Sequence, residues 1–188
     1  TASTKGPGTS GNSGAVATTA RYALRASASA TLLIVGQAPG TRVHETGVPW
    51  NDRSGDQLRA WLALDKDVFY DESRVAIMPM GFCYPGVQAR GGDKPPRPEC
   101  APAWHDLLLP QMLDVELVLL VGMYAQRRYL GKDRKRTLTD TVAAWRDYAP
   151  RHIPLPHPSW RNTGWRKKNP WFEADVLPML RDRVSKLV

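Results

Sequence analysis

One histidine of this chain lies in a segment whose residue types and spacing suggest chemistry. It is His157, within the sequence IPLPHPSWRNTGW at residues 153–165. Pro156 and Pro158 restrict the backbone on both sides and would hold its imidazole in place. A neutral imidazole can donate one hydrogen bond, and a donor held in advance stabilises an oxygen that gains negative charge as a bond breaks. The segment therefore makes His157 a candidate hydrogen-bond donor, although a lone histidine is more often structural.

A second short motif, GQAPG at residues 36–40, follows the apolar run TLLIV at residues 31–35. The histidine motif also follows a strand-like segment, which ends near Leu155. Because parallel strands present their carboxyl ends at one edge of a sheet, where open α/β sheets bind ligands, we expect both motifs to form one site. Main-chain N–H groups of the compact turn would face the ligand. The residues expected to line this side are Gln37, Ala38, Pro39 and Gly40.

Segments with strand and helix patterns alternate along the chain, which is typical of a parallel sheet covered by helices. We therefore predict an α/β fold, a three-layer α/β/α sandwich around a central, mainly parallel four-stranded sheet. Strands are expected at 32–35, 75–78, 117–121 and 151–155, and helices at 55–64, 102–112, 124–130, 138–147 and 171–184.

The ends of the predicted domain follow from composition. Residues 1–29 are rich in Gly, Ser, Thr and Ala, and we expect a flexible tail in which Tyr22 and Leu24 are the plausible anchors. Residues 30–188 would form one domain. Pro and Gly cluster in residues 84–102, which predicts a long irregular loop within that domain.

The formal charge of +8 over 188 residues favours an anionic partner, with nucleic acid as the leading candidate. Of two basic segments, residues 127–136 are typical of a solvated helix end. Residues 161–168 adjoin the histidine motif, interleave charge with tryptophan, and predict DNA contact. No apolar run approaches the roughly 20 residues of a membrane span, so we expect no membrane partner and an intracellular, cytoplasmic location.

Two cysteines, Cys83 and Cys100, are too few for a four-cysteine zinc or iron–sulfur site. They could be free thiols or a disulfide, and a cytosolic location favours the thiols. We expect no metal and no cofactor.

Other reaction classes fit poorly. The turn at residues 36–40 lacks the lysine of a phosphate loop and the glycine spacing of a dinucleotide site. Ser159 does not stand in the G-x-S-x-G elbow of a serine hydrolase.

The combined motifs resemble the uracil-DNA glycosylase superfamily from about residue 32 to residue 184. GQAPG, HETGVPW and SGDQL are similar to the motif block of its thermostable iron–sulfur branch, as are KPPRPECAPAW and LVLLVGMYA further along. HPSWRN resembles the HPS-x-RN motif of the single-strand-selective monofunctional branch. The mixture looks like a divergent bacterial subgroup.

Two departures from the family pattern bear on mechanism. Relatives carry Asp or Asn at the position of Ala38, or Glu at that of Gln37, and neither position has a carboxylate here. Water would then be oriented by main-chain groups, or by Glu45 or Asp52 from the following loop. The N-terminal cysteine pair of the iron–sulfur branch is also absent, so the resemblance implies no cluster.

The resemblance also implies roles for individual residues. His157 would donate to the 2-carbonyl oxygen of the base, Trp50 would stack on the base, and Met78 stands near the asparagine that reads the uracil edge in relatives. Arg161 matches the wedge that enters the duplex. The expected catalytic residues are His157, Gln37, Glu45 and Asp52. The expected base contacts are Gln37, Ala38, Pro39, Gly40, Trp50 and Met78. The expected DNA contacts are Ser159, Trp160, Arg161, Asn162, Arg166, Lys167 and Lys168.

These observations predict a monomeric, monofunctional DNA glycosylase of the bacterial nucleoid. It would flip uracil, and other deaminated or damaged bases, out of DNA and hydrolyse the N-glycosidic bond to initiate base excision repair. One alternative is a catalytically weak protein of the same fold that binds lesions or abasic sites. Another is a hydrolase of small nucleotides or nucleosides, which would leave the basic, tryptophan-containing segment without a purpose.

Overall fold

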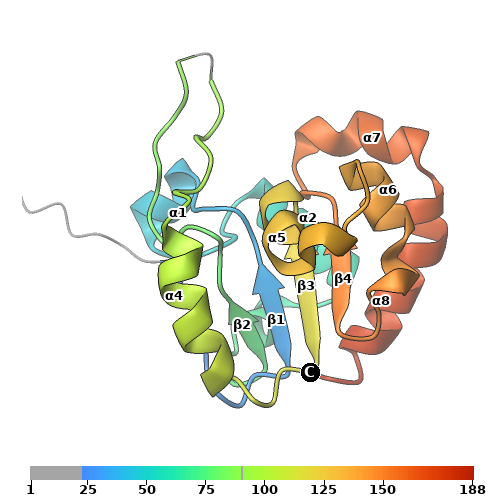
Figure 1. Ribbon diagram of the computed structural model, residues 1–188, viewed down its shortest axis with the longest axis horizontal. Coiled ribbons are helices and arrows are strands. Elements are labelled where there is room, and N and C mark those ends of the chain that lie inside the picture. Colours follow the sequence, from blue (N-terminus) through green and yellow to red (C-terminus); the bar gives the residue numbers. More distant parts are fainter. Residues whose placement is uncertain (1–22, 90) are drawn as a thin grey trace, which may run out of the picture.

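A four-stranded parallel sheet forms the centre of the computed structural model, which describes residues 23–89 and 91–188. The strands are β1 (Leu32–Val35), β2 (Val75–Ile77), β3 (Leu117–Val121) and β4 (His152–Leu155), in the spatial order β2-β1-β3-β4. Leu32 is paired with Val75 on one side and with Leu117 on the other. Figure 1 shows helices around this sheet. The predicted α/β fold is confirmed.

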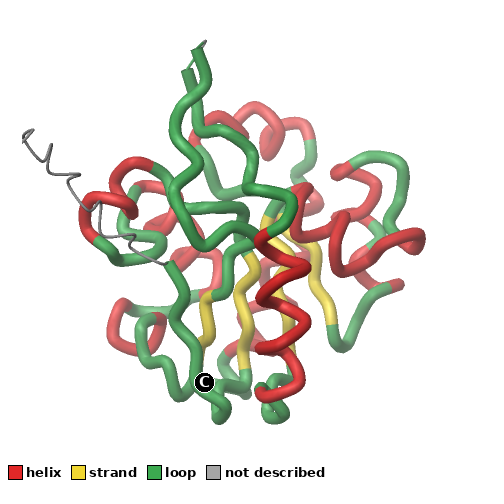
Figure 2. Tube along the Cα trace, turned by 60° about the vertical axis from the view of Figure 1, so that its left-hand side comes forward, coloured by secondary structure: helices red, strands yellow, loops and turns green. Residues whose placement is uncertain are grey.

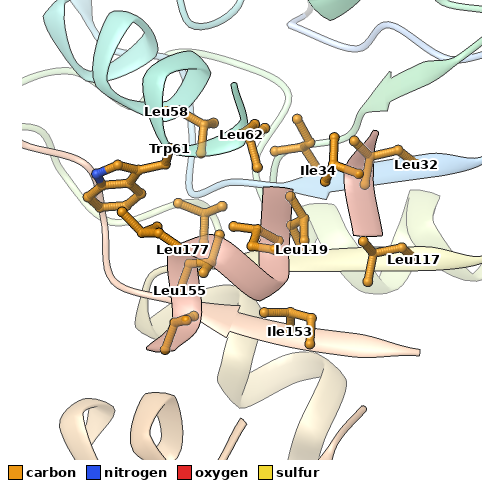
Figure 3. Close-up of a cluster of buried hydrophobic side chains, with 14 of the residues drawn as sticks. Leu32, Ile34, Leu58, Trp61, Leu62, Leu117, Leu119, Ile153, Leu155 and Leu177 are labelled. Carbon is orange, nitrogen blue, oxygen red and sulfur yellow. The ribbon is translucent and has the colours of Figure 1, made fainter. Parts of the chain in front are cut away.

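The strands are rich in Val, Leu and Ile because both faces of the sheet are covered. Leu32 and Ile34 of β1 face one core cluster with Leu58, whereas Leu33 and Val35 face the other. The first cluster packs the sheet against α2 (Arg53–Leu62) and α8 (Leu177–Val184), and the second packs it against α4 (Cys100–Leu108) and α5 (Met123–Leu130). Figure 3 shows the first cluster. These are the three layers of the predicted sandwich.

The helices differ from the expected ones mainly at their ends. The segment expected at 138–147 is α6 (Leu138–Ala143) followed by a separate 3-10 turn, Trp145–Asp147. The last helix begins as a π-helical turn, Phe172–Val176, because Pro178 has no N–H for the carbonyl of Ala174. Three short helices had no recognisable period in the sequence: α1 (Thr41–Thr46), α3 (Lys66–Phe69) and α7 (Thr163–Lys168).

The predicted tail falls partly outside the described residues, which begin at Ala23. The Ala23 N–H donates to the Phe82 carbonyl at 3.1 Å, and Arg25 forms an antiparallel bridge with Ile77 of β2. Leu24, one of the two expected anchors, packs against the second core cluster. The packed part of the chain therefore includes residues 23–27.

Residues 84–89 and 91–98, here called the projecting loop, extend away from the body of the molecule (Figures 1 and 2). Its described part is more regular than expected. Val87 and Asp93 form an antiparallel bridge, and the Lys94 N–H donates to the Gly86 carbonyl at 2.8 Å. These contacts give the loop the shape of a narrow hairpin. Helix α4 then begins at Cys100.

Within the described ranges, no helix has both the length and the apolar composition required to cross a membrane.

Candidate active site

A cavity of about 750 Å³ opens at the carboxyl ends of β1 and β4. The two strands are separated by β3, so the turn after β1 and the histidine motif after β4 approach each other across the end of β3. This is the place where the chain changes direction across the sheet, as expected for a ligand site. The predicted residues that line the cavity are Gln37, Ala38, Pro39, Gly40, Trp50, Asp52, His157, Ser159, Trp160, Arg161 and Asn162.

Some predicted residues lie elsewhere. Glu45 is exposed on α1 and is not part of the cavity lining. Met78 is fully buried in the second core cluster, and Pro79 lines the cavity instead. The expectation that Met78 contacts the base is therefore corrected, because its side chain points into the core. Arg166, Lys167 and Lys168 lie on α7, outside the cavity.

The cavity also has lining residues that the sequence did not single out. Asp93 reaches it from the projecting loop, and its carboxylate would lie 3.3 Å from a Cβ atom added at Gly40. Arg42 and Arg53 add positive charge at the wall. Arg53 directly follows the predicted site residue Asp52 in the sequence, and this proximity could have predicted its place at the cavity wall. Asp93 could not, because its place depends on how a proline-rich loop folds.

Trp50 has an unusual backbone, with φ of +56°. A bulky residue rarely adopts this left-handed conformation, and such strain is often found at functional sites. Its indole lies against Gly36, where an added Cβ would be 2.8 Å from the indole Cζ2. The indole is also tilted by 36° to the His157 ring, with 5.7 Å between ring centroids. Trp50 and His157 thus form adjacent walls of the cavity.

Gly55 of α2 is required for this conformation. An added Cβ at Gly55 would lie 1.6 Å from the Trp50 carbonyl oxygen. Gly55→Ala is therefore expected to lower the free energy of unfolding by more than about 2 kcal/mol in urea denaturation. Gly164→Ala is the matched control, because its added Cβ meets no atom within 4 Å; it should change stability by less than about 1 kcal/mol. Equal tolerance of both substitutions would contradict this account of the Trp50 backbone.

The loop that carries His157 is fixed from within. The Asn162 Nδ2 donates to the His157 carbonyl at 2.7 Å, and the Arg161 N–H donates to the Ser159 Oγ at 3.3 Å. Burial lowers the pKa of His157 below 6.5, while the negative charge of Asp52 raises it and opposes part of that effect. Near neutral pH the imidazole is therefore uncharged, which is the form expected of the donor.

The burial of His157 and its interaction with Asp52 predict how the imidazole titrates with pH. The midpoint for His157, followed by NMR of the imidazole C–H signals, should lie below 6.5 because burial disfavours the charged ring. Asp52→Asn removes a negative charge and should move the midpoint further down. His157→Ala identifies the signal among those of the four histidines. A higher midpoint in Asp52→Asn would show that the two side chains do not interact as described.

Asp52 is held as the N-cap of α2. Its Oδ1 accepts a hydrogen bond from the Gly55 N–H at 2.9 Å. The cap leaves the carboxylate at the cavity wall, since Asp52 is also a lining residue. The Gln37 amide reaches Gly122, the residue after β3, where an added Cβ would lie 2.7 Å from its Nε2. The cavity therefore combines an imidazole donor, a carboxylate, a side-chain amide and an indole.

The family model that matches this chain is that of the uracil DNA glycosylase superfamily, over residues 25–181, more than four fifths of the length. The chain belongs to that superfamily. A solved structure, wild-type SMUG2 of Pedobacter heparinus, is similar with a TM-score of 0.44 and 16% sequence identity, over 84% of this chain and 74% of that chain. Membership supports DNA glycosylase activity and DNA as the partner.

For a glycosylase of this superfamily, the surface around the cavity is the expected place of DNA contact. Trp160 is 70% exposed beside the cavity. Arg161 extends toward the projecting loop, where an added Cβ at Gly92 would be 3.1 Å from its Nη1. Trp165 differs from Trp160, because its indole N–H donates to the Thr139 Oγ1 at 2.8 Å and its ring packs edge to face on Phe172. Trp165 is thus a packing residue.

The cysteines are free thiols. Cys83 is exposed, and Cys100 is half-buried, with its Sγ accepting a hydrogen bond from the Phe82 N–H at 3.3 Å. Among residues 23–89 and 91–188, no group of three or more His, Cys, Asp and Glu side chains is arranged to hold a metal ion.

Proposed function

We propose that this protein is a monofunctional, monomeric DNA glycosylase that removes uracil, and other deaminated or damaged bases, from DNA. The observation that carries the proposal is the presence of His157, Asp52 and Trp50 in the lining of one cavity. A flipped base needs a stacking surface and a hydrogen-bond donor, and hydrolysis needs a positioned water. These three side chains supply one group for each requirement.

In the proposed reaction the base leaves the duplex and packs beside the Trp50 indole. His157 donates a hydrogen bond to the 2-carbonyl oxygen of the base, which gains negative charge as the N-glycosidic bond breaks and the sugar acquires oxocarbenium character. The Asp52 carboxylate orients a water toward C1′ and accepts its proton as the C–O bond forms. The products are an abasic sugar and the free base, which carries away the electron pair of the broken bond.

Recognition of the base edge would rest on Gln37. Met78 is buried in the core, and the Nδ2 of Asn162 is already donated to the His157 carbonyl. Gln37 remains at the cavity wall with an amide that presents both a donor and an acceptor. A flexible amide accepts several base edges by rotation, and this supports a substrate range wider than uracil.

DNA would be held by the surface beside the cavity, with Arg161 and Trp160 near the flipped nucleotide. Helix α7 presents Lys167 and Lys168 as exposed side chains. Arg166 is partly engaged, because its Nη1 lies 3.6 Å from the Glu173 carboxylate. The two lysines are therefore the best candidates for phosphate contacts.

The double variant Lys167→Ala/Lys168→Ala should weaken binding to uracil-free DNA. Each lysine that neutralises a phosphate releases counterions, so the slope of log affinity against log salt should fall by about 2. Fluorescence anisotropy at several salt concentrations measures it. Lys66→Ala/Lys186→Ala removes the same charge elsewhere, from α3 and from the end of the chain beyond α8. An equal loss of slope in both double variants would argue for binding through net charge alone.

The proposal is tested with labelled oligonucleotides that each carry one uracil, hypoxanthine, xanthine or normal base, in single- and double-stranded form. After incubation, alkali breaks the strand at any abasic site. Alkali-dependent cleavage of the uracil strand, with normal strands intact, is the expected result. Tight binding to uracil or abasic DNA without cleavage would instead favour a lesion-binding protein. The reason to consider this alternative is that neither Gln37 nor Ala38 is a carboxylate.

A further inference from the structure

A buried arginine lies behind the cavity and contacts the backbone of Trp50. Arg59 of α2 is 6% exposed, and its Nη1 donates to the Trp50 carbonyl at 3.3 Å. Its Nη2 is 2.5 Å from the Asp56 carboxylate, which supplies the counter-charge. A buried guanidinium is costly unless its N–H groups are paired, so the acceptors around Arg59 fix its position.

Tyr70 completes this contact from the other side. Its hydroxyl donates to the Pro49 carbonyl at 2.9 Å and accepts from the Arg59 Nη1 at 3.3 Å. Burial raises the pKa of Tyr70, so the hydroxyl keeps the proton that it donates. The Arg59 guanidinium also lies 5.2 Å from the Phe69 ring centroid and 5.7 Å from that of Tyr70. Two successive carbonyls, at positions 49 and 50, thus accept hydrogen bonds from the half-buried Tyr70 and the buried Arg59.

Arg59 and Tyr70 stabilise a backbone conformation that Trp50 would not adopt by itself. The φ of +56° is unfavourable for a tryptophan, and such strain persists only where the surroundings fix it. Neither Arg59 nor Tyr70 lines the cavity. Their contacts reach it through Trp50, whose indole lies close to both Gly36 and the His157 ring.

We infer that Arg59 and Tyr70 are positioning residues, which hold the 49–50 backbone so that the Trp50 indole faces the flipped base beside His157. The inference rests on the proposed function for its catalytic consequence, but the geometry of Trp50 can be measured independently. Lysine at position 59 retains a charge but lacks the planar fork that reaches two acceptors at once. Phenylalanine at position 70 removes a single hydroxyl.

The test compares Arg59→Lys and Tyr70→Phe with Arg181→Lys. Arg181 is a matched control, because it also donates to backbone carbonyls of α2, at Trp61 and Ala60, away from the cavity. The readouts are the single-turnover rate of uracil release, the affinity for uracil-free DNA, and the ¹⁹F NMR signal of Trp50 in 5-fluorotryptophan-labelled protein. Trp50→Phe assigns that signal among the seven tryptophans.

Arg59→Lys and Tyr70→Phe should each shift the Trp50 signal, and Arg59→Lys should lower the single-turnover rate by about tenfold with DNA affinity unchanged. In a Trp50→Ala background, Arg59→Lys should cause no further loss, since the two changes act through one group. If the rate losses of Arg59→Lys and Trp50→Ala multiply in the double variant, or if the Trp50 signal does not shift, the inference is overturned. If Arg59→Lys does not fold, the signal in Tyr70→Phe decides. If the wild type releases no uracil, the proposed function fails while the ¹⁹F comparison still decides the positioning role.

Discussion

His157→Ala is expected to lower the single-turnover rate of uracil release by about 10²–10³-fold, the usual consequence of losing one donor to a developing oxyanion. The loss should appear in the rate and hardly in DNA affinity, because phosphate contacts carry most of that affinity. Quenched-flow or manual sampling with alkali cleavage measures the rate, and anisotropy with uracil-free DNA measures the affinity.

His152→Ala is the matched control for this variant. His152 lies at the amino end of β4, the same strand that leads into the histidine motif, and it does not line the cavity. Its loss should leave the cleavage rate within about threefold of the wild type, since His152 is half-buried away from the cavity and touches none of the proposed reacting groups. Equal rates for the wild type and His157→Ala would remove His157 from the mechanism.

Asp52→Asn is expected to have the second large effect, a loss of about 10²–10⁴-fold in the single-turnover rate, as for other positioned general bases. Asparagine caps a helix as well as aspartate does, so α2 should remain intact and urea unfolding should be nearly unchanged. The substitution therefore removes the proton acceptor for the water without removing the cap. A rate loss without a stability loss is the combined result that supports the assignment.

Asp93→Asn tests the other carboxylate of the cavity. Asp93 comes from the projecting loop and is exposed, whereas Asp52 is half-buried and its charge acts on His157. We expect Asp93→Asn to retain most of the rate. The reverse pattern, an active Asp52→Asn and an inactive Asp93→Asn, would mean that the water is oriented from the projecting loop.

The main features of the site were predictable because they depend on local sequence. Short apolar runs gave the strands, and motifs placed directly after them had to meet at one sheet edge, so Gln37 and His157 line one cavity. Met78 was expected to contact the base, but it does not line the cavity, whereas the next residue, Pro79, does. At the end of a strand one step changes the direction of a side chain, so Met78 enters the core and Pro79 meets the cavity.

The rest of the site depends on contacts between segments distant in sequence. Asp93 is brought to Gly40 by the hairpin shape of the projecting loop, whose proline-rich sequence indicated an irregular loop. Arg59 had the spacing of an ordinary polar position on α2, and its burial became evident only with Tyr70 and the Trp50 carbonyl beside it. The left-handed backbone of Trp50 has no local signal, because glycine is the residue that usually marks this conformation.

The most direct test of the account is the release of free uracil from a uracil-containing oligonucleotide in H₂¹⁸O, measured by mass spectrometry of both products. Hydrolysis by the proposed mechanism yields one equivalent of free uracil and an unbroken abasic strand with one ¹⁸O at C1′, and the yield of both should fall greatly with Asp52→Asn. Intact uracil DNA bound in a stable complex would contradict it, and so would strand cleavage without alkali, since neither is expected of a monofunctional hydrolase.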